Sequence, residues 1–382
     1  MNKHRILKSK VGGISLGDPK DTDDFKYFTY PEFPKFTSDH SSLMATLLTK
    51  EIFDKLIHKK TSKNYTFSNA IQAGSEYPFL QTGITTADQE SYIIFKEIIN
   101  PVIKARHKFD PDVTNQKNEI NPSKLNLSSL KKFNLDKYIV SSRIRSARNI
   151  ADFALPPGIL KEERVDLESY LRSIFDKLSQ KWGGQYHSLA KMPEDQKKSF
   201  RSKGFLFQDP EPTTVLLNCG SARNWPNERG IFISDNQQIM CWCNEEDHCR
   251  IISLQEGSDI IAVFENFAKL SDTFIDKVES SGKKIMYSSN LGFISTCPSN
   301  LGTGLRASVK IKLNKLIENK EMLHKISKEN NLDIRGAGGD GSLTTGYIFD
   351  ISNKQRLGFT ETELVQKMID GIVQLMSFEE QN

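Results

Sequence analysis

The 382-residue sequence has little that marks a membrane protein, a nucleic-acid-binding protein or a common nucleotide-binding fold. No apolar run approaches the length of a membrane span. The net charge of +4 is too small to indicate nucleic-acid binding by itself. There is also no Walker A loop and no His-Glu-x-x-His segment. We therefore expect no membrane or nucleic-acid partner, and any nucleotide site must be built from side chains and irregular loops.

Cysteine is also scarce, with five residues in the whole chain. An odd number argues against a closed disulfide framework and for a reducing compartment. Cys241, Cys243 and Cys249 lie close to His248, but their spacing fits no common zinc pattern, so we interpret them as structural thiols. The basic N-terminus is followed by acidic residues and by no signal-peptide core, which predicts a cytoplasmic protein.

The apolar periodicity changes along the chain. Helical spacing recurs over residues 41–56, 88–106, 162–182, 260–281 and 361–376, and Pro101 is expected to interrupt the second segment. Strand-like runs cover residues 138–145, 214–217, 230–234, 238–244, 250–254 and 306–313. The pattern predicts an α+β protein, in which a mainly helical N-terminal part precedes a part built around a mainly antiparallel sheet. The expected divisions are a flexible extension at 1–35, a helical domain at 36–118, a linker at 119–136 and a second domain at 137–382.

The most informative segment is the decapeptide at residues 297–306, Cys-Pro-Ser-Asn-Leu-Gly-Thr-Gly-Leu-Arg. Its proline fixes one backbone angle, and its glycines let the backbone approach a ligand closely. Backbone N–H groups in such a turn can bind an anion, and a thiol in that field would have a lowered pKa. Taken alone, the segment predicts either a reactive or a structural turn around Cys297.

Three further segments gather charge. Arg143 and Arg145 are two apart in a strand-like run, so their guanidinium groups share one face and can bind phosphate. Residues 244–250, Asn-Glu-Glu-Asp-His-Cys-Arg, hold three acids that a cationic guanidino group could neutralise. Residues 335–342 begin with Arg335 and are rich in glycine, which predicts a mobile loop. The alternatives are a solvated strand face for the first segment, a solvated turn or a metal site for the second, and a flexible surface loop for the third.

Together these segments resemble the phosphagen kinases, a family that includes creatine kinase and arginine kinase. The resemblance runs from about Phe33 to the C-terminal helix and includes the segments at 138–148, 222–231 and 349–358. It implies a small all-helical N-terminal domain and a larger catalytic domain at residues 137–382, with a mainly antiparallel sheet flanked by helices. It also implies that the chain transfers the γ-phosphoryl group of ATP reversibly to a guanidino nitrogen, with Mg²⁺. The implied partners are ATP or ADP and a small guanidino compound, with Mg²⁺ held by no dedicated protein ligands, and the chain would be a monomer or a homodimer.

The resemblance also assigns roles to individual residues. Glu246, Cys297 and Asp340 are implied to bind and orient the guanidino substrate and to act in catalysis, with Gly83 and Ile84 in the loop that shapes specificity. ATP phosphates are implied to bind a set of five arginines: Arg143, Arg145, Arg250, Arg306 and Arg335. In this assignment Cys297 orients the guanidinium as a thiolate, and Ser299 tunes it by hydrogen bonding.

The acceptor is less clearly indicated. The stretch at 72–92 is short, as in arginine kinases, and Asp340 stands where arginine kinases place a second acid. The amino-acid sequence of the 297–306 segment is more similar to that of creatine kinase, and Thr85 replaces a tyrosine of arginine kinases. We expect L-arginine, with creatine or taurocyamine as alternatives. Gly204 and Lys310 replace two histidines that neighbour adenine in the family, and a catalytically silent nucleotide-binding homologue is the alternative to an enzyme.

Overall fold

The computed structural model describes residues 27–336 and 347–381. They form one eight-stranded sheet, in which the strands follow the order β2-β3-β4-β5-β1-β8-β10-β9 and every neighbouring pair is antiparallel. The strands are β1 (Ile139–Arg148), β2 (Gln185–Ser188), β3 (Gly230–Ile233), β4 (Ile239–Cys243), β5 (Cys249–Glu256), β8 (Arg306–Lys312), β9 (Leu332–Gly336) and β10 (Ile348–Asn353). The short strands β6 (Tyr287–Ser288) and β7 (Gly292–Phe293) make a separate hairpin. The expected antiparallel sheet is confirmed.

Helices cover one face of this sheet. Side chains alternate between the faces of a strand, so Ile144 and Val309 point away from the face that carries Arg143 and Arg145. They belong to the largest apolar core, which also holds side chains of α7 (Lys161–Trp182), α10 (Ile260–Glu279) and α12 (Glu361–Gln381). The opposite face carries the arginines of β1 and β8 at its centre, and on its β3-β4-β5 side it carries a third apolar cluster that includes Met240, Trp242 and Ile252.

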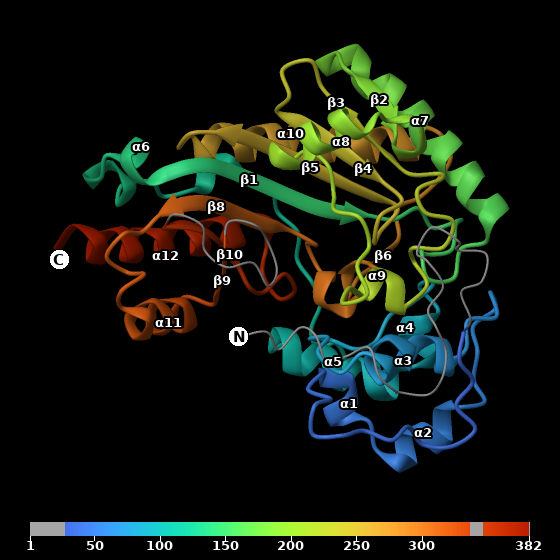
Figure 1. Cartoon of the computed structure of the whole chain (residues 1–382). Helices are drawn as coiled ribbons and strands as arrows, with labels where there is room; N and C mark the ends of the chain where they lie inside the picture. Colours follow the sequence, from blue (N-terminus) through green and yellow to red (C-terminus); the bar gives the residue numbers. More distant parts are fainter. Residues whose placement is uncertain (1–26, 337–346, 382) are drawn as a thin grey trace.

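The N-terminal part is helical and lies beside the sheet, as Figure 1 shows. It contains α1 (Leu43–Leu47), α2 (Lys50–Leu56), α3 (Phe67–Glu76), α4 (Ser91–Ile94) and α5 (Lys96–His107). Its core is separate from that of the sheet but includes Met286, Leu291 and Leu301 from the C-terminal part. The two parts therefore share apolar contacts next to the decapeptide.

The two helices expected in the N-terminal part are each broken, the first without an expected break and the second at another residue than expected. The segment 41–56 divides at Leu48 and Thr49, because the Thr49 hydroxyl accepts a hydrogen bond from the amide of Ile52 and begins α2. Pro101 was expected to interrupt the second segment, and this was wrong: it lies inside α5, and the break falls at Phe95. Buried Ile98, Ile99, Val102 and Ile103 surround Pro101 and hold the helix together despite the lost backbone hydrogen bond.

The strand expected at 214–217 was also wrong, because these residues form the short helix α9 (Val215–Asn218). A short apolar run fits a helix as well as a strand, and here Asn218 closes the turn by donating to the Thr214 carbonyl over 2.7 Å. The remaining helical segments are α6 (Leu135–Tyr138), α8 (Glu194–Ser202), α11 (Lys320–Glu329) and the 3-10 turns η2 (Pro122–Lys124), η3 (Leu130–Lys132), η4 (Leu189–Lys191) and η5 (Pro298–Asn300).

Candidate active site

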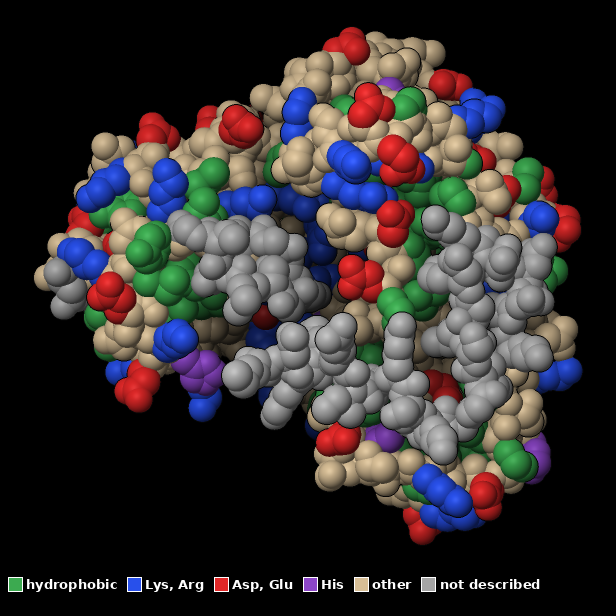
Figure 2. Space-filling model, in the orientation of Figure 1, with side chains coloured by type: hydrophobic (Ala, Val, Ile, Leu, Met, Phe, Trp, Pro, Cys, Tyr) green, Lys and Arg blue, Asp and Glu red, His purple; other side chains and the backbone are tan. Residues whose placement is uncertain are grey.

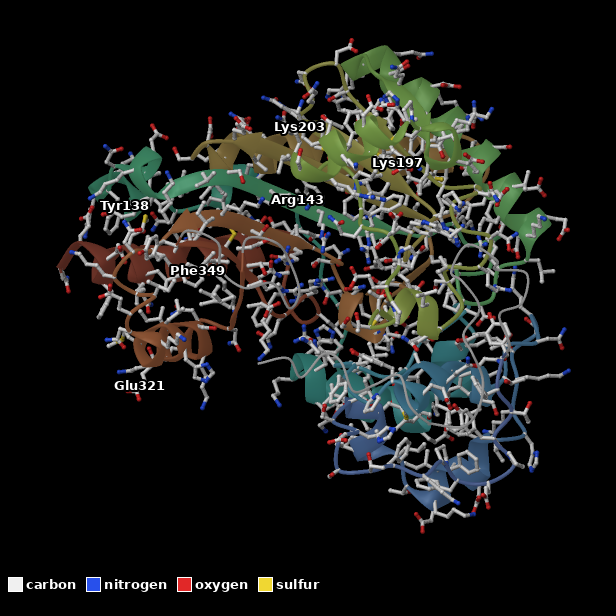
Figure 3. The ribbon with its side chains drawn as sticks, viewed as in Figure 1. Tyr138, Arg143, Lys197, Lys203, Glu321 and Phe349 are labelled. Atoms are coloured by element: carbon white, nitrogen blue, oxygen red, sulfur yellow. The ribbon has the colours of Figure 1, made fainter. Side chains whose placement is uncertain are left out.

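The arginines predicted to bind phosphate gather on the open face of the sheet. Arg143 and Arg145 project from the central strand β1, and Arg306 of β8 lies directly opposite Arg145 in the strand register. Figure 2 shows lysine and arginine side chains gathered in a hollow between the sheet and the N-terminal helices. Figure 3 labels Arg143 on the sheet, below Lys203 at the end of α8. The sheet thus brings together cations that are 160 residues apart in the sequence.

Two of these cations are partly buried and make no ion pair with a carboxylate of the described residues. The guanidinium of Arg143 lies 5.1 Å from the centre of the Trp242 ring, and that of Arg145 lies 5.7 Å from it. Nε and Nη2 of Arg143 are buried and have no hydrogen-bond partner among the described residues. Burial and the nearby Arg306 lower the pKa of Arg143 to about 10, and burial with Arg143 lowers that of Arg145. A polyanionic ligand would relieve this concentration of unpaired positive charge.

The acidic segment forms the turn between β4 and β5 and surrounds the fourth arginine. Arg250 contacts Glu245 at 2.7 Å, Glu246 at 2.5 Å and Asp247 at 3.4 Å. Burial alone would lower the pKa of Arg250, but these three carboxylates raise it overall. Arg250 is therefore held at the junction between the arginines and the acids.

A hydrogen-bond network fixes this turn against the decapeptide. Asp247 is fully buried, and its Oδ1 accepts from Asn149 Nδ2 and from the Thr296 amide, both at 3.0 Å. Asn300 Nδ2 donates to Glu246 Oε1 over 3.1 Å, and Arg356 Nη1 donates to Asn300 Oδ1. Sequence analysis assigned no role to Asp247, Asn300 or Arg356, although all three lie in or beside the predicted motifs.

Cys297 lies beside Glu246 and is almost fully buried. Its sulfur is 3.0 Å from the Ser299 hydroxyl, which agrees with the predicted contact. Burial and the charge of Glu246 raise the pKa of the Cys297 thiol, while hydrogen bonds from Ser299 and Thr82 lower it in part. The lowered pKa expected from the decapeptide is therefore wrong, because burial and the carboxylate of Glu246, which comes from the turn between β4 and β5, outweigh the hydrogen bonds to the sulfur.

The predicted specificity loop is docked against the decapeptide. The Thr86 amide donates to the Thr296 carbonyl over 2.9 Å, and Ile84 is buried. Gly83 has φ +76°, and a Cβ there would come within 2.3 Å of the Ser42 hydroxyl, so a side chain is excluded. The Thr85 hydroxyl is 3.1 Å from that of Tyr65, in the interior. These contacts place the loop beside the segment that carries Cys297.

The last two predicted arginines are paired with carboxylates. Arg306 Nη2 lies 3.0 Å from Asp350 Oδ1, and Arg335 Nε and Nη2 both donate to Asp333 Oδ2, at 2.8 and 2.5 Å. Neither acid was assigned a role from the sequence. Asp340, the second predicted substrate carboxylate, lies outside the described residues.

The positions of the two expected adenine neighbours are also defined. Lys310 lies on β8 opposite Ser141 and Asp350, on the same face as Arg306. Gly204 has φ +73°, and a Cβ at this position would meet no atom within 4 Å. The space beside Gly204, where the family has a histidine next to adenine, therefore holds no side chain from this position.

The cysteines that suggested zinc are core residues. Cys241, Cys243 and Cys249 are buried in the main apolar core. His248 uses both ring nitrogens in hydrogen bonds: Nδ1 accepts from the Ile150 amide and Nε2 donates to the Ala154 carbonyl. Among residues 27–336 and 347–381, no group of three or more His, Cys, Asp or Glu side chains has an arrangement that could hold a metal ion.

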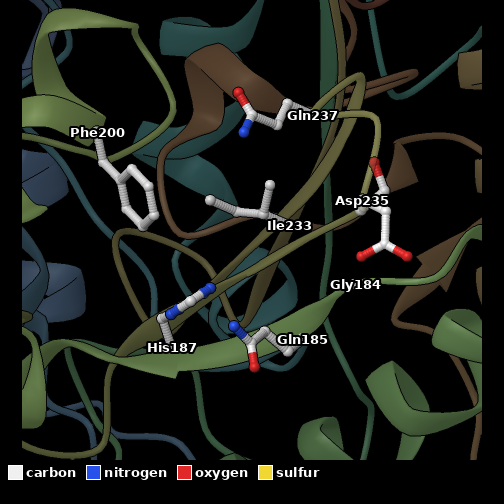
Figure 4. A pocket seen from close by; sticks show the side chains of 8 residues that line it. Gly184, Gln185, His187, Phe200, Ile233, Asp235 and Gln237 are labelled. Carbon is white, nitrogen blue, oxygen red and sulfur yellow. The ribbon is translucent and has the colours of Figure 1, made fainter.

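Two hollows lie at the other end of the sheet, along its edge strand β2. The larger, of about 380 Å³, is lined by Gln185, His187, Phe200, Asp235 and their neighbours (Figure 4). None of the predicted site residues lines either hollow. In the described part of the chain, no helix has the length and apolar character needed to cross a membrane.

A row of arginines beside a glutamate and a thiol is suited to phosphoryl transfer onto a cationic acceptor. The model for the C-terminal catalytic domain of ATP:guanido phosphotransferases matches residues 166–382, and the model for the N-terminal domain of these enzymes matches residues 38–104. The chain belongs to this family, the phosphagen kinases, and it is a phosphotransferase enzyme.

Similar proteins and structures agree with this assignment. The chain is 36% identical over 362 residues to the M-type creatine kinase of Gallus gallus, covering 93% of this chain and 92% of that protein. It is 37% identical over 357 residues to the testis isozyme of creatine kinase from Oncorhynchus mykiss, covering 91% and 90%. A crystal structure of lombricine kinase matches with a TM-score of 0.84 and 34% identity, over 93% of this chain and 96% of that chain. The duplicated taurocyamine kinase of Schistosoma mansoni, with bound transition-state analogue components, matches with a TM-score of 0.80 and 32% identity, over 90% of this chain and 47% of that chain.

Proposed function

We propose that this enzyme transfers the γ-phosphoryl group of ATP reversibly to a guanidino nitrogen, in a Mg²⁺-dependent reaction that buffers cellular energy. The observation that carries the proposal is the continuity of one surface. Arg143, Arg145 and Arg306 lie at one end, and Glu246 and Cys297 lie at the other, joined by Arg250. A nucleotide polyphosphate and a cationic acceptor can therefore meet end to end.

The arginines would act mainly through electrostatics. Phosphoryl transfer spreads negative charge over the equatorial oxygens of the transferred group, so fixed cations that are already in place lower the barrier. Guanidinium forks hold phosphate oxygens in a defined orientation and remain charged in a buried site. Arg143, Arg145, Arg250, Arg306 and Arg335 would bind the phosphates in this way.

Glu246 and Cys297 would hold the acceptor. Glu246 lies close to Arg250 in the ligand-free protein, and its other oxygen is fixed by Asn300. A guanidinium bound between Glu246 and Cys297 would pair with the carboxylate, align its nitrogen with the γ-phosphorus and favour the thiolate. Glu246 is also the group placed to accept the proton that the nitrogen loses. Asp340 is proposed as a second contact to the acceptor.

Mg²⁺ would enter with the nucleotide. Mg²⁺ in kinases is commonly held by substrate phosphates and water with few protein ligands. This fits a site whose described residues contain no dedicated metal-binding group. When bound, the ion would neutralise charge on the phosphates that the arginines also contact.

L-Arginine is the acceptor that the short segment at 72–92 and Asp340 support. A second candidate, creatine, is supported by the 36–38% identity to creatine kinases over more than 90% of the chain. Taurocyamine and lombricine are supported in the same way by the similarity to kinases of those compounds. The Thr85 hydroxyl contacts Tyr65 in the interior. The proposed specificity loop therefore has a small side chain at the position where these acceptors would be distinguished.

A coupled ATP assay over arginine, creatine, taurocyamine, glycocyamine and lombricine tests the proposal. We expect turnover with one of the five at a higher kcat/KM than with the others. A clear preference for creatine would overturn the choice of arginine, and turnover with none of them would leave a catalytically silent nucleotide-binding protein as the better description. We further propose a cytoplasmic location, which the five free cysteines support.

A further inference from the structure

The five arginines differ in how their charge is balanced before a nucleotide arrives. Arg143 has two buried nitrogen atoms without a partner among the described residues. Arg335, by contrast, directs Nε and Nη2 at a single oxygen of Asp333. These two nitrogens form the edge of the guanidinium with which arginine holds phosphate in a fork geometry. In this structure, a carboxylate therefore contacts the edge of Arg335 that is proposed to bind phosphate.

The pairing follows from the strand itself. Asp333 and Arg335 are two residues apart on β9, so both side chains leave the same face of the sheet. Arg335 lies opposite Asp350 of β10, and Asp350 pairs with Arg306 of β8. Two acids and two arginines thus alternate on one face of three neighbouring strands.

Asp333 is surrounded by cations from both parts of the protein. Burial raises the pKa of Asp333, but Arg335 and, beyond it, Arg306 and Arg106 lower it overall, so the carboxylate stays ionised. Arg106 comes from α5 of the N-terminal part, and its Nε is buried without a partner in the described residues. Removal of the Asp333 charge would leave these arginines to repel one another.

We propose that Asp333 is a positioning residue that holds Arg335 in the nucleotide-free enzyme and competes with nucleotide phosphate for it. The inference rests on the proposed function only in that Arg335 binds phosphate. Asp333 then stabilises the empty protein and weakens nucleotide binding, because phosphate must displace the carboxylate and approach its charge. Loss of the Asp333 charge should therefore lower stability and tighten nucleotide binding. Loss of a residue that only maintained the fold would weaken both.

The test uses the full chain with Asp333→Asn, which keeps the shape of the side chain and removes its charge. ADP affinity is measured by calorimetric titration, and Tm is measured with and without ADP. We expect the Kd for ADP to fall about three- to tenfold, the range of a partly buried ion pair. The Tm of the free protein should fall, and saturating ADP should narrow the difference from the wild type. The apparent KM for ATP should fall by a larger factor than kcat changes.

Four controls assign the effect to phosphate and to Arg335. Asp276→Asn removes an equal charge from an exposed ion pair on α10 and should leave ADP affinity unchanged. Pyrophosphate should bind more tightly to Asp333→Asn, whereas adenosine should bind as it does to the wild type. In an Arg335→Ala background, Asp333→Asn should no longer tighten ADP binding by the same factor. Asp333→Glu, which restores the charge, should return the affinity toward that of the wild type.

Unchanged or weaker ADP binding by Asp333→Asn would overturn the inference, as would equal tightening in the Arg335→Ala background. If Asp333→Asn does not fold, Asp333→Ser is measured in the same way and carries the same expectation. A wild-type protein that neither binds ADP nor phosphorylates any guanidino compound would contradict the proposed function itself. Normal wild-type binding and turnover with an unchanged variant would contradict only the role of Asp333.

Discussion

Asn300 Nδ2 donates a hydrogen bond to Glu246 Oε1 over 3.1 Å, and the same amide accepts one from Arg356 through Oδ1. A single side chain of the decapeptide thus fixes the carboxylate proposed to hold the acceptor. Its second partner is a cation whose pKa burial and the nearby Arg106 and Arg306 lower to about 9. The amide is suited to this place because it donates to an acid and accepts from a base at once.

Asn300→Asp should separate these two contacts. The variant keeps an acceptor for Arg356 but replaces the donor toward Glu246 by a repelling carboxylate. We expect kcat/KM for the acceptor to fall by about 10- to 100-fold, since a displaced Glu246 misaligns the guanidinium. ADP affinity should change little. Wild-type acceptor kinetics in Asn300→Asp would show that this hydrogen bond does not position Glu246.

Glu246→Gln should reduce kcat strongly while leaving the fold intact. The amide has the shape of the carboxylate, but it neither pairs with a guanidinium nor accepts its proton, so we expect a loss of roughly 10²- to 10⁴-fold. Circular dichroism and ADP titration should match the wild type. Glu265→Gln on the exposed side of α10 is the matched control and should keep full activity. Near-normal turnover of Glu246→Gln would remove the role assigned to it.

Arg143→Lys should weaken nucleotide binding although the charge is kept. Lysine cannot hold phosphate through two parallel N–H groups. It also lacks the planar guanidinium that packs against the Trp242 ring. We expect the Kd for ADP to rise about tenfold by calorimetric titration. Arg172→Lys, on α7 and outside the predicted site, should bind ADP as the wild type does. Equal affinity in both variants would mean that Arg143 does not bind phosphate.

The sequence could predict those parts of the site that motifs and alternation encode. Arg143 and Arg145 share a face because a strand repeats every two residues, and the structure places Arg306 on the same face, opposite Arg145. Periodicity also predicted α7 and α10 and the antiparallel sheet. The strand expected at 214–217 failed because a four-residue apolar run does not distinguish a turn of helix from a strand.

Partners that come from distant segments could not be predicted in this way. Asp333 contacts Arg335 from the same strand, but its other cations, Arg106 and Arg306, reach it only through the tertiary fold. The pKa of Cys297 depends on burial and on Glu246, which is 51 positions away in the sequence, so local composition gave the wrong direction. Residues 119–136 were expected to be a linker, and their placement against α12, through Glu119, Asn121 and Asn126, likewise depends on contacts about 240 residues apart.

His248 should make the stability of the protein depend on pH. Its Nδ1 accepts from the Ile150 amide, and burial lowers the pKa of the ring to about 4. Protonation would break that hydrogen bond and place a charge in the interior, so below about pH 6.5 the unfolded chain binds the proton more readily. The contribution of His248 to the free energy of unfolding is therefore complete above about pH 6.5 and falls as the pH drops toward about 4, by about 3 kcal/mol in all.

Denaturant unfolding at a series of pH values measures how steeply the free energy of unfolding changes with pH. His248→Asn keeps an acceptor for the Ile150 amide but cannot be protonated, so its stability should fall less steeply between about pH 6.5 and about pH 4 than that of the wild type. His58→Asn, at an exposed position on the surface, should keep the wild-type slope. The depressed pKa of His107, about 3, contributes equally to all three proteins and cancels in the comparison. Parallel profiles for the wild type and His248→Asn would show that His248 is not the group that binds the proton on unfolding.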